Sequence, residues 1–148
     1  MRHTKILYIL LLLFFSGCVK DTLFEKNIVG FWKIKIYTKT IYQDNTPLLS
    51  ECTSEADAGT MEFRSNGTGW YNLVKIMGYG AYEGYGEFTW TNTSTSVTIF
   101  ETSTNKVFRV ISNSSGKVEL KHTDNNFYFP GHSSEYEYSL EEFISLAK

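Results

Sequence analysis

The chain is poor in the residues that build helices. Residues 18–148, which follow a short N-terminal segment discussed below, hold only seven Leu and four Ala. They hold 21 aromatic residues, 15 Thr, eight Ile and seven Val. Because β-branched and aromatic side chains favour strands, this composition argues against a helical bundle or a doubly wound α/β domain. These 131 residues are enough for one domain with a sizeable core and too few for two.

Basic residues and histidines are also scarce. Residues 18–148 carry 12 Lys and Arg against 16 Asp and Glu, a formal charge of −4. This scattered, mildly acidic pattern lacks the basic stripe that nucleic-acid binding requires, so we expect no nucleic-acid partner. The histidines of this stretch are His122 and His132, and neither has neighbours at the spacing of metal ligands. We therefore expect no metal site.

The sequence also lacks the motifs of common enzymes. It contains no G-x-S-x-G motif, and Cys52 has no histidine nearby in the sequence to act as its base. The glycines between residues 78 and 86 precede a strand pattern and not a helix, so they do not form a phosphate-binding loop. We predict a protein without catalytic residues or cofactor.

The N-terminus has the pattern of an export signal. Basic residues in the first five positions precede Ile6–Phe15, ten apolar residues that would span only about 15 Å as a helix, half of a bilayer core. Ser16 and Gly17 then lead into Cys18, which resembles the lipobox of bacterial lipoproteins. The resemblance implies that residues 1–17 are removed, that Cys18 is acylated, and that the bilayer, in particular the outer membrane of a Gram-negative cell, is a partner. The alternative is an ordinary signal peptide followed by a chance cysteine.

After a tether at residues 18–26, the chain alternates between apolar and polar residues, with turn signals in between. This pattern predicts eight strands, at residues 30–42, 60–64, 68–77, 80–90, 96–101, 106–112, 117–122 and 135–140. Ser139–Glu142 also fits a helix capping box, so we expect a short helical turn after the last strand. Eight antiparallel strands joined in order are typical of an up-and-down barrel, all-β in class, and an open sandwich is the alternative.

Two motifs resemble a known family. Gly30-Phe31-Trp32 is similar to the Gly-x-Trp signature of lipocalins, and Phe63–Thr68 resembles the second-strand turn of lipocalin-like lipoproteins from Bacteroidota. The resemblance implies a lipocalin-like barrel over residues 27–148. Lipocalins also carry an Arg after the last strand that covers the Trp, and the segment after Tyr138 has no Arg.

Loop lengths and the parity of the strands locate a candidate ligand site. The two long connections, Gln43–Gly59 and Thr123–Ser134, are expected at the same end of the barrel, which we call the open end. If Phe88 and Trp90 face inward, four glycines between residues 78 and 86 also face inward, which leaves room for a ligand or marks a bend in the sheet. The predicted ligand-binding residues are Thr38, Met61, Ile76, Tyr82, Gly84 and His122.

The predicted function is therefore the binding of a small, partly apolar molecule in the open end. In the alternative, the aromatic triplet Phe127-Tyr128-Phe129 docks onto another protein of the cell envelope. We expect Trp32, Trp70 and Trp90 to fill the opposite, closed end of the barrel. Cys52 is expected to be a loop thiol and His132 to lie in a solvated loop.

Overall fold

The structure is a computed structural model that describes residues 24, 27–74, 84–102, 104–132 and 135–148. A short 3-10 turn, η1 (Leu49–Glu51), lies between the second and third strands. The strands are β1 (Gly30–Gln43), β2 (Thr46–Pro47), β3 (Thr53–Phe63), β4 (Thr68–Leu73), β5 (Gly84–Asn92), β6 (Ser96–Phe100), β7 (Asn105–Ser114), β8 (Lys117–Asp124) and β9 (Tyr138–Ala147).

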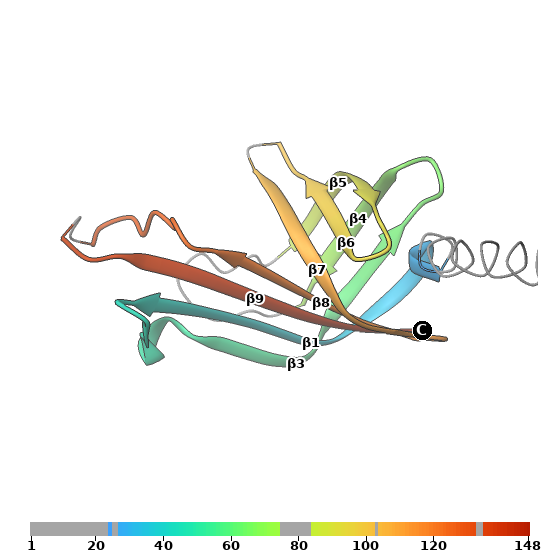
Figure 1. The fold of residues 1–148 in the computed structure, drawn as a ribbon. Helices are drawn as coiled ribbons and strands as arrows, with labels where there is room; N and C mark the ends of the chain where they lie inside the picture. Colours follow the sequence, from blue (N-terminus) through green and yellow to red (C-terminus); the bar gives the residue numbers. More distant parts are fainter. Residues whose placement is uncertain (1–23, 25–26, 75–83, 103, 133–134) are drawn as a thin grey trace, which may run out of the picture.

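The long strands form a closed antiparallel barrel. From β3 to β9, each strand pairs with the next one along the chain, and β1 pairs with both β3 and β9, which closes the sheet (Figure 1). β2 adds only two paired residues to the end of β1, so eight strands make up the barrel. The predicted eight-stranded up-and-down barrel is confirmed, and closure removes the free edges that an open sheet would expose.

The last strand differs from the prediction. The expected helical turn after residue 140 is wrong, because β9 continues to Ala147 and hydrogen-bonds to β1 on one side and β8 on the other. Pairing with β1 and β8 gives partners to the backbone N–H and C=O groups of residues 141–147. A single helical turn would have left part of these groups without a partner, because the groups at the ends of a helix have none within it. The third strand is also longer than expected, since it begins at Thr53 and not at residue 60. The connection between β1 and β3, predicted to span Gln43–Gly59, is therefore limited to residues 44–52.

The closed end is filled by aromatic side chains. Trp32 is fully buried, and its indole N–H donates to the carbonyl of Ile28 at 2.7 Å. Phe63 contacts Trp90 edge to face, with ring centres 5.3 Å apart. The ammonium of Lys148 lies 4.7 Å from the centre of the Trp32 ring, so a lysine covers this Trp where the family resemblance implies an arginine. The buried core extends into the segment assigned to the tether, because Phe24 is buried in it.

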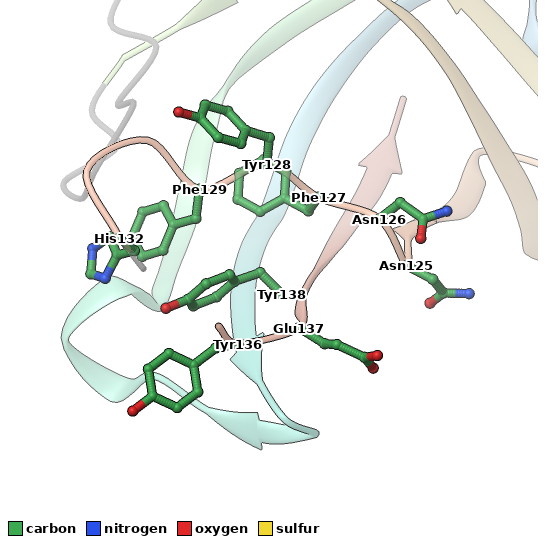
Figure 2. A pocket seen from close by; sticks show the side chains of 9 residues that line it. All are labelled: Asn125, Asn126, Phe127, Tyr128, Phe129, His132, Tyr136, Glu137 and Tyr138. Atoms are coloured by element: carbon green, nitrogen blue, oxygen red, sulfur yellow. The ribbon is translucent and has the colours of Figure 1, made fainter. Parts of the chain in front are cut away.

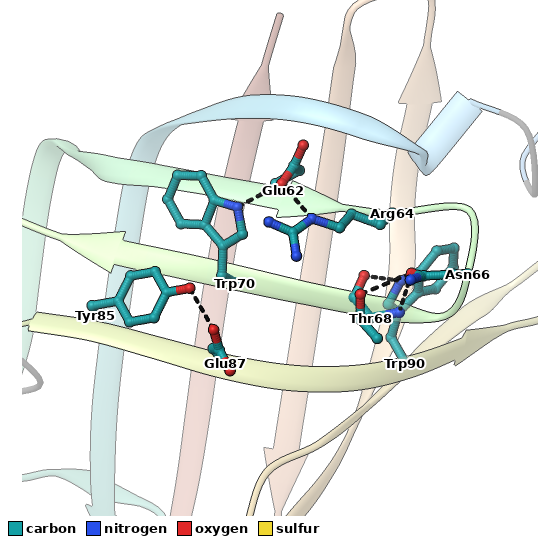
Figure 3. A network of polar contacts seen from close by, with 8 residues as sticks. All are labelled: Glu62, Arg64, Asn66, Thr68, Trp70, Tyr85, Glu87 and Trp90. Atoms are coloured by element: carbon teal, nitrogen blue, oxygen red, sulfur yellow. Dashed lines mark hydrogen bonds and ion pairs between the residues drawn. The ribbon is translucent and has the colours of Figure 1, made fainter.

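Trp70 does not take part in this core. It lies on the outer face of β4, where its indole N–H donates to the carboxylate of Glu62 and its ring stacks on Tyr85 (Figure 3). Its neighbour Gly69 is the residue that faces inward, and a Cβ at Gly69 would come within 2.4 Å of the Phe88 ring. The expectation that all three tryptophans fill the closed end is thus correct for Trp32 and Trp90 and wrong for Trp70.

A β-bulge near the start of β1 changes which of its residues face inward. The register with β9 passes from Ile34 opposite Leu146 to Ile36 opposite Ser145, which leaves Lys35 as an extra residue. Ile36 is consequently 43% exposed. The inward positions of β1 beyond the bulge carry odd numbers, as the burial of Tyr37 and Ile41 shows.

At the open end, four strands extend past the other four. β1, β3, β8 and β9 continue as a curved sheet beyond β4–β7 (Figure 1). A second apolar cluster covers this extension and consists of Ile41, Phe129, Tyr138 and Leu140, with Leu48 and Phe127 packed against it. The connection between β8 and β9 supplies part of this cluster, so it folds back onto the sheet. None of the helical segments that the structure describes has the length and hydropathy needed to cross a bilayer.

Candidate functional site

A carboxylate is buried inside the barrel near its open end. Glu142 of β9 has 3% of its surface exposed, and it faces inward between Leu140 and Ile144. The ammonium of Lys106, from β7, lies 2.8 Å from its Oε2 atom and 3.0 Å from its Oε1 atom. The hydroxyl of Tyr37, from β1, donates to Oε1 at 2.7 Å. Three strands thus meet in one charged, hydrogen-bonded network.

The partners of Glu142 keep it ionised. Burial alone raises the pKa of this carboxyl group, because it removes water from the charged form. The charge of Lys106, the hydrogen bonds from Lys106 and Tyr37, and the charge of His122 together outweigh burial, so the pKa of Glu142 lies below its ordinary value. At neutral pH the interior of the barrel therefore holds a carboxylate–ammonium pair.

Two further polar side chains face the same region. Lys39 follows Tyr37 on the inward face of β1, and burial lowers the pKa of its ammonium, with Lys106 acting in the same direction and Glu142 opposing. His122 is the cross-strand neighbour of Glu142 on β8. Its ring lies 5.4 Å from the ring of Phe108, and its Nδ1 atom lies 3.0 Å from the carbonyl oxygen of Val107.

The network borders a small cavity with mainly apolar walls. Its volume is about 50 Å³, which is enough for water or one end of a ligand and well below the roughly 300 Å³ of a complete small-molecule site. The residues that line it come from six strands, β1, β3, β4, β6, β7 and β9, and from Glu101, which directly follows β6. They are Ile34, Tyr37, Met61, Tyr71, Leu73, Ile99, Glu101, Lys106, Phe108, Glu142 and Ile144.

The structure brings only some of the predicted ligand residues to this place. Met61 lines the cavity, and His122 faces inward beside Glu142. Thr38 faces outward, because the bulge before it shifts the parity of β1 by one residue. Gly84 is the exposed first residue of β5 and does not line the cavity. Cys18, Ile76 and Tyr82 lie outside the described residues.

The space that the inward glycines were expected to leave is filled at one position. A Cβ at Gly86 would come within 2.3 Å of the Tyr71 ring, so Tyr71 occupies the room beside this glycine. Gly78 and Gly80 lie outside the described residues. Gly86 therefore serves close packing with Tyr71, which is neither the ligand space nor the bend in the sheet that the sequence suggested.

Sequence reasoning missed Glu142, Lys106 and Tyr37. Glu142 lies in the segment that was expected to form a helical turn, and the bulge turns Tyr37 inward in place of the predicted Thr38. A signal was present for Glu142, since it lies between Leu140, Ile144 and Leu146 in a period of two. An acidic residue at an inward position of a strand indicates a buried charge that needs a partner.

A second, larger pocket lies outside the barrel, in the connection between β8 and β9 (Figure 2). Its volume is about 380 Å³. Its lining residues are Asn125, Asn126, Phe127, Tyr128, Phe129, His132, Tyr136, Glu137 and Tyr138, and we call it the aromatic loop pocket. Phe129 is buried, so within the predicted docking triplet Tyr128, at 80% exposure, is the most accessible ring.

Comparison with known proteins does not extend these observations. No protein-family model matches this chain, and no similar curated protein or solved structure was found. Over the part of the chain that the structure describes, no three His, Cys, Asp or Glu side chains are grouped to hold a metal ion. Cys52 is a free thiol that donates to the carbonyl of Leu48 at 3.2 Å. The barrel interior with its buried network and the aromatic loop pocket are the features that bear on function.

Proposed function

We propose that this protein is a lipid-anchored, lipocalin-like barrel that binds a small, partly apolar ligand at its open end. The observation that carries the proposal is the ionised network of Glu142, Lys106 and Tyr37 at the edge of an apolar cavity. A buried ion pair contributes little net stability, because desolvation of the two charges offsets their attraction. Its place beside a cavity near the open end favours a role in orienting the polar group of a ligand.

The size of the cavity limits how the ligand would lie. About 50 Å³ accepts the end of a narrow apolar chain and not a whole ligand. The rest of such a molecule would extend along the inner face of the projecting sheet. Lys39 follows Tyr37 on that face of β1, whereas the next inward residue, Ile41, is buried in the second apolar cluster, so this path ends near Lys39.

The test is binding of a thin apolar probe, such as a dansyl-labelled alkyl carboxylate, followed by its fluorescence. We expect the wild type to bind it and Lys106→Met to bind about tenfold more weakly, through the loss of a charged hydrogen-bond donor. Tyr37→Phe is a milder second variant that keeps the ring. Lys121→Met is the matched control, because Lys121 of β8 forms a 2.8 Å ion pair with Glu141 of β9 on the outer face of the barrel. Failure of the wild type to bind, or equal effects of the two Lys→Met changes, would contradict the proposal.

The lipid anchor is a separate part of the proposal. It is supported by the lipobox-like sequence before Cys18, and an acylated Cys18 would hold the barrel at a membrane surface, for which we propose the outer membrane of a Gram-negative cell. Metabolic labelling with a fatty acid should tag the wild type and leave Cys18→Ala unlabelled. Labelling that survives this substitution would exclude acylation of Cys18.

Docking of an envelope protein through residues 123–134 is less well supported. It depends on Tyr128, because Phe129 is only 2% exposed and belongs to the second apolar cluster. Native mass spectrometry of the protein taken from its own envelope separates the two functions. A bound small molecule supports the first, and a bound protein supports the second.

A further inference from the structure

The aromatic loop pocket has features of its own that the barrel ligand does not explain. Phe129 forms its floor, with 2% of its surface exposed. The ring of His132 stacks on Phe129 at 3.8 Å, and Tyr138 meets Phe129 at an angle of 70°. Tyr136 in turn lies at 75° to Tyr138. The rings around the pocket therefore take two nearly perpendicular orientations, and His132 covers one face of Phe129 (Figure 2).

The surroundings of this pocket are acidic. Residues 123–138 and 43–52 together contain five Asp and Glu and no Lys or Arg. The two segments lie side by side, because Asp44 donates its backbone N–H to the carbonyl of Glu137 at 2.9 Å and accepts the N–H of Glu137 on its carboxylate at 3.2 Å. Burial raises the pKa of Tyr138, and Tyr136 and Asp44 raise it further. The Asp and Glu carboxylates of the two segments repel an anion and attract a cation.

We propose that the aromatic loop pocket binds a methylated ammonium group. Aromatic faces attract such a cation through the negative face of the ring, and the attraction is strongest where water is displaced. Glu137 lines the pocket and supplies a full negative charge, and Asn125 and Asn126 supply amide groups. The pocket volume of about 380 Å³ lies within the range of small-molecule sites.

Other ligand classes fit less well. A primary ammonium group is strongly hydrated and a guanidinium group carries five N–H donors, so both need several hydrogen-bond acceptors, whereas six of the nine lining residues carry aromatic rings. An apolar neutral molecule would gain nothing from the acidic residues around the pocket. A methylated ammonium group is a weakly hydrated cation, and both the rings and the acidic charge favour it.

The test compares choline with its neutral carbon isostere, dimethylbutanol, by isothermal titration calorimetry on the full chain. We expect choline to bind and the isostere to bind about 3-fold to 30-fold more weakly, which is the range of a cation–π contribution. Equal binding of the two molecules, or no binding of choline at millimolar concentration, would overturn the proposal.

Two pairs of variants locate the site. Tyr136→Leu removes a ring that is 45% exposed, so the fold should survive, and choline binding should weaken at least threefold, while Tyr136→Phe retains it. Glu137→Gln should also weaken binding, whereas Glu135→Gln, the same change outside the lining, should not. Unchanged choline affinity in both Tyr136→Leu and Glu137→Gln would place choline elsewhere and refute the assignment.

The methylated ammonium group could belong to a free molecule or to a lipid headgroup, and one further comparison distinguishes these sources. The full chain is placed in phosphatidylglycerol nanodiscs or in nanodiscs containing phosphatidylcholine, and choline is titrated into each. A lower apparent affinity for choline in phosphatidylcholine identifies the lipid headgroup as a competing ligand. Equal affinity for choline in both nanodiscs identifies the free cation as the ligand. In either case the group that the pocket recognises is a methylated ammonium.

Discussion

The ammonium of Lys106 lies 2.8 Å from the carboxylate of Glu142 inside the barrel, while Lys121 and Glu141 form a pair of the same length on the outside. Glu141 and Glu142 are neighbours in β9, so successive side chains of one strand place one ion pair in the core and one in solvent. The exposed fractions are 3% for the Glu142 side chain and 33% for that of Glu141. The outer pair is therefore an internal control for the inner one.

The first prediction concerns the loss of each carboxylate. Glu142→Gln leaves the ammonium of Lys106 without its counter-charge in the barrel, and breaking a buried pair costs about 3–5 kcal/mol of the free energy of unfolding. Glu141→Gln should cost at most about 1 kcal/mol, because the outer pair is exposed. Urea unfolding of the two variants measures both values. Similar losses in the two variants would show that the inner pair contributes no more than a surface pair.

The second prediction is a pH dependence that belongs to Glu142. Its pKa in the folded protein lies below the ordinary value of 4.5, so the folded state binds the proton less readily than the unfolded chain. The stabilisation is fully present above pH 4.5 and is lost as the pH falls through the folded-state pKa. The difference in unfolding free energy between wild type and Glu142→Gln should therefore be constant at neutral pH and shrink below about pH 4.5. A difference that stayed constant down to pH 3 would contradict this assignment.

The third prediction tests the bulge in β1. Tyr37→Ala removes a buried ring and a hydrogen bond to Glu142, so it should lower the unfolding free energy by about 3–5 kcal/mol. Thr38→Ala changes an outward side chain and should cost less than about 1 kcal/mol. Thermal unfolding of both variants ranks them directly. The reverse order would mean that β1 continues without a shift in parity.

The fourth prediction concerns the lysine over Trp32. Lys148→Met keeps the length of the side chain and removes its charge, so it should cost about 0.5–1 kcal/mol of stability through the lost cation–π contact. Lys148→Arg should retain most of the contact, because a guanidinium group also stacks on an indole ring. Denaturant unfolding followed by tryptophan fluorescence measures these differences. If Met and Arg at this position behaved alike, the charge of Lys148 would be irrelevant to the closed end.

Much of the fold could be predicted from local patterns. Alternation with a period of two, interrupted by Ser65-Asn66-Gly67 and Asn113–Gly116, located the strands near the closed end, where the turns are short. Trp32 and Trp90 were placed correctly for the same reason, since regular strands run between those turns. The start of β3 near the open end and the course of β9 from residue 141 toward the closed end were wrong, because pairing with other strands extends both segments beyond their local signals.

The candidate site was less predictable than the fold. Parity placed Met61 at the cavity and His122 beside Glu142, because β3 near Met61 and β8 keep a regular register there. The same count failed for Thr38, because one extra residue at Lys35 turns every later side chain of β1 to the opposite face. The sequence could not show whether the inward position of Gly86 leaves room for a ligand, because the Tyr71 ring that fills this room comes from another strand.

The amino-acid sequence by itself determined the class of fold, because composition and periodicity act on each strand locally and eight such strands in order close most simply into a barrel. Only the tertiary structure decided which charges are buried together. Glu142 receives its partners from residues 36 and 105 positions away, on strands that meet it through the closure of the sheet. Likewise, the backbone pairing of Asp44 with Glu137 brings two acidic connections together beside the aromatic rings. Register, bulges and closure set these contacts, and they are properties of paired strands that no single segment encodes.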